Sequence, residues 1–275
     1  MNFKKLVLVV IAAAVVLGGI AVSKKSLFEF YVNINRDKSP LINKSDPTQN
    51  QSRVFSTSFE SIGDFSGFYI VPQNYSGSSS HDLSKEQVRS GTYSHKGWIY
   101  KENSESFFTN TNHRGYPTIQ LNRTGGGAFK TPALIEFWVW LDMDIQKGEW
   151  FSFATLDYTN STEWDPVLVN LSDEGTVQLM HVPSNGQGKR TFQTNSIKFP
   201  MKKWTKLTMC LDFDAQDGNV KVWQNDQLVS TSMIAKGRGD GFLTQAHFGL
   251  YAPGSLSRGV VYNDDLVIKE GTCDR

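Results

Sequence analysis

The sequence predicts an all-β domain built as a sandwich of two antiparallel sheets. The chain of 275 residues contains seven Trp, nine Tyr and 18 Phe beside 23 Gly, a combination that is typical of strands and turns. After Arg53, apolar runs of about five to nine residues alternate with turn residues such as Gly, Asn, Asp, Ser and Pro. No convincing helical pattern interrupts these runs, which favours one large β-sandwich.

The N-terminal segment, residues 1–22, is predicted to be a transmembrane or signal helix. Two lysines precede an uncharged run of 17 residues that ends at Val22. This length lies at the lower limit for crossing a bilayer core of roughly 30 Å and just above the upper limit for the apolar part of a signal peptide. Ala21-Val22-Ser23 is an acceptable cleavage site, whereas the following Lys24-Lys25 disfavours cleavage. We expect either a single-pass membrane anchor or a cleaved leader, and both export the rest of the chain.

The rest of the chain is predicted to comprise a polar stalk, residues 23–52, a sandwich domain, residues 53–270, and a short tail, residues 271–275. Residues 1–52 carry seven Lys and Arg against three acids, and the remainder carries 21 bases against 24 acids. Because a mildly acidic domain has no basic footprint, we expect no nucleic-acid partner. Cys210 and Cys273 are the only cysteines, and an exported protein can join them in a disulfide or keep two thiols.

Twelve strands are predicted between residues 54 and 268. Each is an apolar or alternating run that is bounded by turn residues. In chain order they are residues 54–60, 94–100, 116–121, 133–142, 150–157, 166–171, 175–181, 204–213, 219–224, 227–233, 245–251 and 260–268. Tight-turn sequences at Asp217-Gly218 and Asn225-Asp226 predict that residues 204–233 form a three-stranded meander.

Three segments resemble concanavalin A-like lectin and glucanase jelly rolls. Trp204-Thr-Lys-Leu-Thr-Met-Cys-Leu-Asp-Phe followed by Val220-Lys-Val-Trp-Gln-Asn-Asp-Gln-Leu-Val is similar to the central meander of that superfamily. Ser90-Gly-Thr-Tyr-Ser-His-Lys is similar to an early strand, and Val261-Tyr-Asn-Asp-Asp-Leu-Val-Ile is similar to the closing strand. The resemblance covers about residues 53–270 and implies a jelly-roll sandwich. It implies less about function, because lectins, glycosidases, lyases and adhesion modules share this architecture.

A second resemblance is to jelly-roll polysaccharide lyases of the alginate lyase type. The candidate counterparts of their active-site strands are Arg114, Gln178-Leu-Met-His181 and Ala246-His-Phe-Gly-Leu-Tyr251. The sequence departs from the family pattern in two ways. The Lys of the Tyr-bearing strand and the acid that follows the family Arg are missing. In addition, His181 lies three residues after Gln178, which places the two on opposite faces of a regular strand.

A lyase needs a group that neutralises a uronate carboxylate, a base for the proton next to that carboxylate and an acid for the leaving oxygen. The candidates for the first role are Arg114, Gln120 and Gln178, and the candidates for proton transfer are Tyr251, His247 and His181. In a regular strand His247 and Tyr251 share one face, so we expect them to converge. The alternative for each His is a surface or hydrogen-bonded structural role.

The strand at residues 133–142 predicts a sugar-binding face. Strict alternation places Glu136, Trp138, Trp140 and Asp142 on one side and aliphatic residues on the other. Flat Trp rings stack on the apolar faces of sugars and carboxylates accept sugar hydroxyls, so we expect this side to line a groove. The alternative is that loops bury these rings as ordinary packing. Tyr116, Gln120 and Gln178 are further candidates for sugar contacts.

Glu60 and Asp265 are candidate ligands of a structural calcium. They resemble the early Glu and late Asp that related sugar-binding sandwiches use, with backbone carbonyls completing the oxygen shell. The alternative is that both carboxylates lie in solvent at a sheet edge. We expect no organic cofactor.

These observations predict an exported, membrane-tethered jelly-roll domain that handles extracellular polysaccharide. The first hypothesis is a non-catalytic, lectin-like sugar-binding module, motivated by the Trp138 and Trp140 face. The second is a polysaccharide lyase that cleaves a uronate-containing polymer by β-elimination. Hydrolysis ranks last, because a retaining glycosidase needs two carboxylates about 5 Å apart and those of Glu136 and Asp142 are expected roughly 20 Å apart.

Overall fold

The structure, a computed structural model, describes most of the chain after residue 51. The described residues are 52–61, 78–102, 112–116, 118–120, 128–158, 166–181, 190–192, 195–214, 216–233, 241–271 and 273. The expected membrane or signal segment, residues 1–22, and the stalk before Ser52 lie outside them. Within the described ranges no helix is long and apolar enough to cross a membrane.

One antiparallel sheet has eight strands. Its spatial order is β14 (Gln227–Ser232), β13 (Val220–Gln224), β12 (Thr205–Leu211), β7 (Ala133–Asp142), β18 (Gly259–Glu270), β3 (Ser94–Ile99) and β2 (Ser79–Ser84), and β1 (Val54–Thr57) also pairs with β18. Along β7 the buried Ile135, Phe137 and Val139 alternate with half-buried Glu136 and Trp138. One face of this sheet is therefore core and the other faces outward.

The second large sheet has six strands. Its order is β11 (Arg190–Phe192), β10 (Val177–His181), β9 (Val167–Ser172), β8 (Trp150–Asp157), β16 (Gln245–Phe248) and β5 (Thr118–Gln120). Two short ribbons accompany the sheets, formed by β17 (Leu250–Ala252) with β4 (His113–Gly115) and by β15 (Phe242–Leu243) with β6 (Phe129–Lys130).

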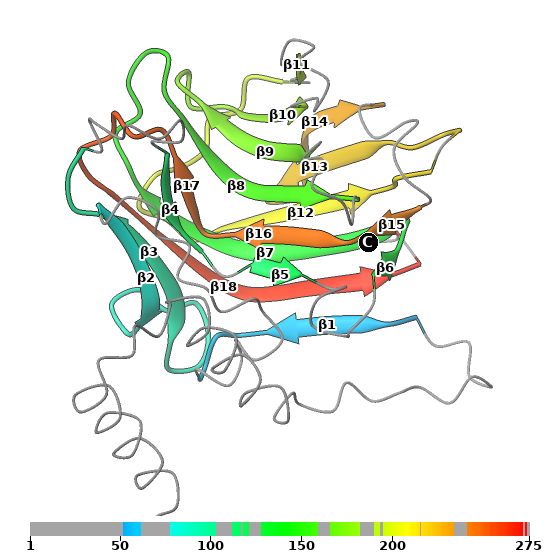
Figure 1. Cartoon of the computed structure of the whole chain (residues 1–275), viewed down its shortest axis with the longest axis horizontal. Coiled ribbons are helices and arrows are strands. Elements are labelled where there is room, and N and C mark those ends of the chain that lie inside the picture. The colour runs from blue at the N-terminus through cyan, green and yellow to red at the C-terminus, as the bar shows by residue number, and fades with distance from the viewer. Residues whose placement is uncertain are drawn as a thin grey trace, which may run out of the picture. The chain divides into compact units, whose positions relative to one another are not determined.

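The two large sheets enclose one hydrophobic core. In Figure 1 β16 lies over β7, and Phe248 of β16 meets Phe137 of β7 edge to face with ring centroids 5.2 Å apart. Both side chains are at most 1% exposed. Burial of a side chain of this size stabilises the fold by about 1.5–3 kcal/mol. The described residues thus form the all-β, two-sheet sandwich that the sequence predicts.

The sequence prediction of strands is accurate in the core and incomplete at the margins. Eleven of the twelve predicted strands are present with small shifts at their ends, whereas β2, β4, β6, β11 and β15 are not predicted. Strand β2 has the polar sequence Ser-Ser-His-Asp-Leu-Ser, which carries no apolar signal and lies at a sheet edge. The predicted strand 245–251 is wrong as a single strand, because Gly249 has a φ of 127° and divides it into β16 and β17.

Cys210 and Cys273 form a disulfide bond, with their Cα atoms 5.3 Å apart. Cys210 is buried on β12, and Cys273 follows the end of β18. Of the two alternatives that the sequence left open, the bonded pair is therefore the one present. The bond ties the C-terminal tail to the eight-stranded sheet.

Candidate functional site

The outward face of the six-stranded sheet carries a polar row that includes His247. Ala246 and Phe248 of β16 point into the core, so Gln245 and His247 point outward. His247 lies opposite Thr155 of β8 and Thr118 of β5 in the sheet register. Three neighbouring strands are thus in register at His247.

His247 is held as a neutral imidazole. The Gln245 side-chain amide donates to Nε2 of His247 at 2.8 Å, and the ring stacks on Tyr116 with centroids 4.6 Å apart. Burial, aided by the positive charge of Arg114, lowers the pKa of His247 to about 3. Because His247 is only 9% exposed and Tyr116 only 4%, these two rings form the base of the site rather than an open platform.

Tyr251 and Arg114 reach the same place from the short ribbon. They are direct partners in the register of β17 and β4, and the Arg114 guanidinium carbon lies 5.3 Å from the centroid of the Tyr251 ring. Asn112 donates a hydrogen bond to the Tyr251 oxygen at 3.2 Å. Tyr251 and Arg114 are both half-buried.

Gly249 lets the chain bring these groups together. A Cβ at this position would stand 2.8 Å from Cε1 of His95 and 2.9 Å from Cβ of Tyr116, and its φ of 127° is one that other residues rarely adopt. Tyr116 contacts His247 on one side and meets the Tyr251 ring edge to face at 6.2 Å on the other. His247 and Tyr251 therefore contact the same ring, that of Tyr116, from two different strands rather than from one face of a single strand.

His181 and Gln178 do not join this cluster. Val177 and Leu179 of β10 pack in the core, so Gln178 points outward and the buried His181 points to the core side of the strand. Two strands, β9 and β8, separate β10 from β16. Gln120 lies opposite Gln245 in the register, which places it on β5 beside the polar row.

Trp138, Trp140 and Glu136 lie on the other sheet. Their side of β7 faces outward from the eight-stranded sheet, away from the core and from Tyr251. The guanidinium of Arg89 covers the Trp138 ring at 4.3 Å. The two Trp residues and Tyr251 therefore lie on different faces of the sandwich.

Trp140 and Glu136, on the same outward face of β7, also contact neighbouring side chains. Trp140 meets the Tyr262 ring edge to face with centroids 5.4 Å apart. Lys206 pairs with Glu136 at 2.5 Å, and the Thr208 hydroxyl donates to the same carboxylate at 3.3 Å. The outward face of β7 thus consists of aromatic rings and ions that already contact one another.

Two residues that contact Tyr251 are not predicted from the sequence. Asn112 orients the Tyr251 hydroxyl, and the ring of Trp150 at the start of β8 meets the Tyr251 ring edge to face at 5.0 Å. Trp150 is the outward member of the alternating pair Trp150 and Phe151, which is a signal that the sequence contains. Asn112 lies in an irregular segment and has no such signal.

The candidate calcium ligands meet at one loop, residues 89–93. The Glu60 carboxylate accepts the backbone N–H of Thr92 at 2.9 Å, and Asp265 accepts the hydroxyl of Ser90 at 2.6 Å. The neighbouring Asp264 accepts the backbone N–H of Arg89 at 2.9 Å, and burial raises the pKa of Asp264 to about 6. In the described part of the chain, no three His, Cys, Asp or Glu side chains are arranged to hold a metal.

Comparisons with known proteins support the fold. No family model matches the sequence, and no curated protein matches it. An endo-β-1,4-glucuronan lyase from the fungus Trichoderma reesei has a similar structure, with a TM-score of 0.56, 14% identity, and coverage of 79% of this chain and 95% of that one. The cellulose-induced protein Cip1 is also similar, with a TM-score of 0.57 and 14% sequence identity. That alignment covers 80% of this chain and 100% of Cip1. At such identities the likeness shows the fold alone, the concanavalin A-like jelly roll that the sequence resembles.

Acidification is expected to destabilise the wild-type protein more than a His247→Gln variant. The folded-state pKa of about 3 lies below the ordinary 6.5, so between these values the unfolded chain binds a proton that the folded chain does not. The contribution of the neutral His247 to the free energy of unfolding is therefore fully present above pH 6.5 and is lost as the pH falls toward 3. At pH 5 the loss attributable to His247 is about 2 kcal/mol. Urea unfolding at pH 7 and pH 5 measures it, and equal pH dependence in both proteins would contradict the buried neutral imidazole.

Proposed function

We propose that the protein is a polysaccharide lyase that cleaves a uronate-containing polymer by β-elimination. The observation that carries the proposal is the position of the Arg114 guanidinium over the Tyr251 ring, with His247 joined to Tyr251 through Tyr116. The guanidinium neutralises the uronate carboxylate, which makes the proton on the adjacent carbon easier to remove. The likeness of fold to a glucuronan lyase supports this reaction class.

Tyr251 is the proposed proton-transfer group. In the phenolate form, its oxygen takes the proton from the carbon next to the carboxylate, the bond from the next carbon to the glycosidic oxygen breaks, and a carbon–carbon double bond forms. The same proton then passes to the departing oxygen, which balances the reaction. Asn112 donates to the Tyr251 oxygen and so fixes it in position as an acceptor. His247 supports Tyr251 through Tyr116 and keeps the base of the site uncharged.

The test is incubation of the purified protein with glucuronan, alginate and polygalacturonate. A lyase produces an unsaturated end group that absorbs in the ultraviolet, so absorbance rises with the true substrate. Hydrolysis of the same polymer would release reducing ends without this absorbance, and that result would refute β-elimination.

A non-catalytic sugar-binding module is the second candidate. It is favoured by the position of His181, which points away from the face where a lyase base would act. Binding of a polymer in the same panel without any rise in absorbance would select this candidate. If no polymer binds and the absorbance does not rise, both candidate functions are rejected.

We also propose that the domain works outside the cytoplasm. Residues 1–22 either anchor it in the membrane or are cleaved off as a leader. The apolar N-terminal run and the bond between Cys210 and Cys273 support export, because disulfides persist in oxidising compartments. Protease added to intact cells would then digest the domain. Resistance in intact cells, with digestion only after lysis, would contradict export.

A structural calcium at Glu60 and Asp265 is a further proposal. The Glu60 and Asp265 carboxylates both contact one loop, and oxygen is the donor that calcium prefers, so backbone carbonyls would complete the shell. Calcium at 100 times its Kd is expected to stabilise the protein by about 2.7 kcal/mol. Thermal unfolding with calcium or with a chelator measures this, and Asp265→Asn should abolish the difference. An equal melting temperature in both conditions would exclude the site.

A further inference from the structure

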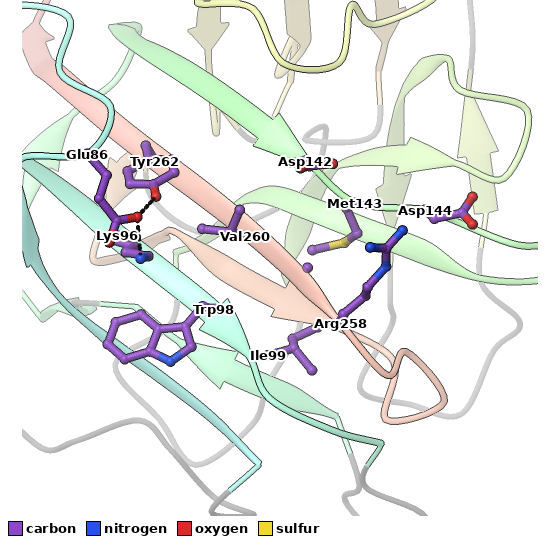
Figure 2. Close-up of a pocket in the computed structure, with 11 residues that line it drawn as sticks. Glu86, Lys96, Trp98, Ile99, Asp142, Met143, Asp144, Arg258, Val260 and Tyr262 are labelled. Atoms are coloured by element: carbon purple, nitrogen blue, oxygen red, sulfur yellow. Dashed lines mark hydrogen bonds and ion pairs between the residues drawn. The ribbon is translucent and has the colours of Figure 1, made fainter.

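A separate pocket of about 280 Å³ lies on the outward face of the eight-stranded sheet. It is formed where β3 and β18 run beside the end of β7 (Figure 2). In the register, Trp98 of β3 lies opposite Val260 of β18, and Val260 lies opposite Asp142 of β7. Because Val261 points into the core, Val260 and its two partners form a row on the outer surface. The pocket is thus on a different sheet from Tyr251.

One end of the pocket is a fixed polar and aromatic wall. Lys96 and the hydroxyl of Tyr262 both donate to one oxygen of Glu86, at 2.6 and 2.5 Å. Figure 2 shows this three-residue contact beside the indole of Trp98. The Lys96 ammonium also lies 5.4 Å from the Trp98 ring centroid. Since Lys96 is already neutralised by Glu86, this end offers Trp98 as a half-buried flat ring rather than a strong positive charge.

The other end of the pocket offers hydrogen-bonding groups. Arg258 and Asp144 are exposed, and within the described ranges neither makes a hydrogen bond or an ion pair. Asp142 forms an ion pair with Lys202 at 3.2 Å and also lines the pocket. A ligand in the pocket therefore has the Arg258 guanidinium as a hydrogen-bond donor and the Asp142 and Asp144 carboxylates as acceptors. The Trp98 ring lies at the other end.

Charge and size select the ligand class. Glu86 pairs with Lys96 and Asp142 with Lys202, which leaves Asp144 and Arg258 as one charge of each sign, so the pocket has no excess positive charge to attract an anion such as a uronate or a phosphate. Its volume lies at the lower end of the range for ligand sites, which suits one sugar ring. A pyranose has an apolar C–H face that stacks on an indole and a rim of hydroxyls that both donate and accept.

We propose that this pocket binds one ring of a neutral glycan, on the side of the sandwich opposite the Tyr251 site. The protein then holds polysaccharide at two places, an anionic segment at Arg114 and a neutral segment at Trp98. This second site does not depend on the lyase reaction, since none of its groups contacts Tyr251.

The experiment is calorimetric titration of the purified full-length protein with three neutral oligomers, cellohexaose, xylohexaose and mannohexaose. At least one is expected to bind, and Trp98→Ala is expected to weaken that binding about tenfold. Arg258→Gln, a change at an exposed position that preserves the fold, is expected to weaken it by about as much. Both variants keep the wild-type rate in the uronate lyase assay.

Matched variants locate the binding. Trp223→Ala changes an indole on β13, which three strands, β12, β7 and β18, separate from β3, and should leave the affinity unchanged. Tyr251→Phe should also leave it unchanged, which separates failure of this site from failure of the lyase. The proposal is overturned if no neutral hexamer binds, or if Trp98→Ala and Arg258→Gln bind as tightly as the wild type.

Discussion

Replacement of Tyr251 by Phe is expected to lower the rate of β-elimination by about 10²- to 10⁴-fold. The change removes one oxygen that transfers the proton and keeps the ring that contacts Trp150, Tyr116 and Arg114. Substrate binding should therefore change little, because Arg114 still neutralises the uronate carboxylate. The measurement is the initial rate of ultraviolet absorbance increase at several polymer concentrations, which separates kcat from KM.

One control variant and one variant of a second site residue are compared with Tyr251→Phe. Tyr100→Phe removes a hydroxyl from an exposed tyrosine outside the site and should keep the full rate. Arg114→Gln should raise KM as well as lower kcat, because it removes the positive charge that holds the carboxylate. A Tyr251→Phe enzyme that retains more than half of the wild-type kcat would rule out Tyr251 as the proton-transfer group.

Strand alternation predicts which side of a strand is core, and it does so accurately here. In β7 the predicted inner residues are at most 1% exposed at Ile135, Phe137, Val139 and Leu141. The rule succeeds because a half-buried strand has a period of two wherever one face packs against a partner sheet. The predicted alternation of Gln178 and His181 is also present for the same reason.

Alternation does not tell which sheet a strand joins. The pattern predicts that Trp138 lies opposite the aliphatic face of its strand and that His247 shares a face with Tyr251. In the structure Trp138 and His247 point outward from opposite sheets. Strand order depends on contacts between residues far apart in the chain, which a local period does not contain. The sequence therefore names candidate residues, whereas their division between two faces required the structure.

Irregular backbone accounts for the other gaps. Gly249 interrupts a run that looks continuous in sequence, and the break positions Tyr251 on a ribbon with Arg114. Asn112 acts through one side-chain hydrogen bond from outside any strand, so no periodicity marks it. Sites of this kind depend on positions where a regular pattern fails, which is why the pattern alone does not locate them.

Replacement of Cys210 and Cys273 together by Ser is expected to destabilise the protein by about 4 kcal/mol. The bond joins residues 63 apart in the sequence, and without it the unfolded chain gains the entropy of opening that loop. For a domain of this size the loss corresponds to a fall in melting temperature of about 10 °C. The native strands should persist, because the buried core around Phe137 is independent of the bond.

Reduction supplies the matched control for this variant. A thiol reductant should lower the melting temperature of the wild type to that of the double Ser variant and should leave the variant unchanged. Urea unfolding of the two proteins under oxidising conditions measures the free energy directly. Identical unfolding midpoints for wild type and variant would show that the tail contributes nothing through this bond, and that the eight-stranded sheet is held by its hydrogen bonds and core packing alone.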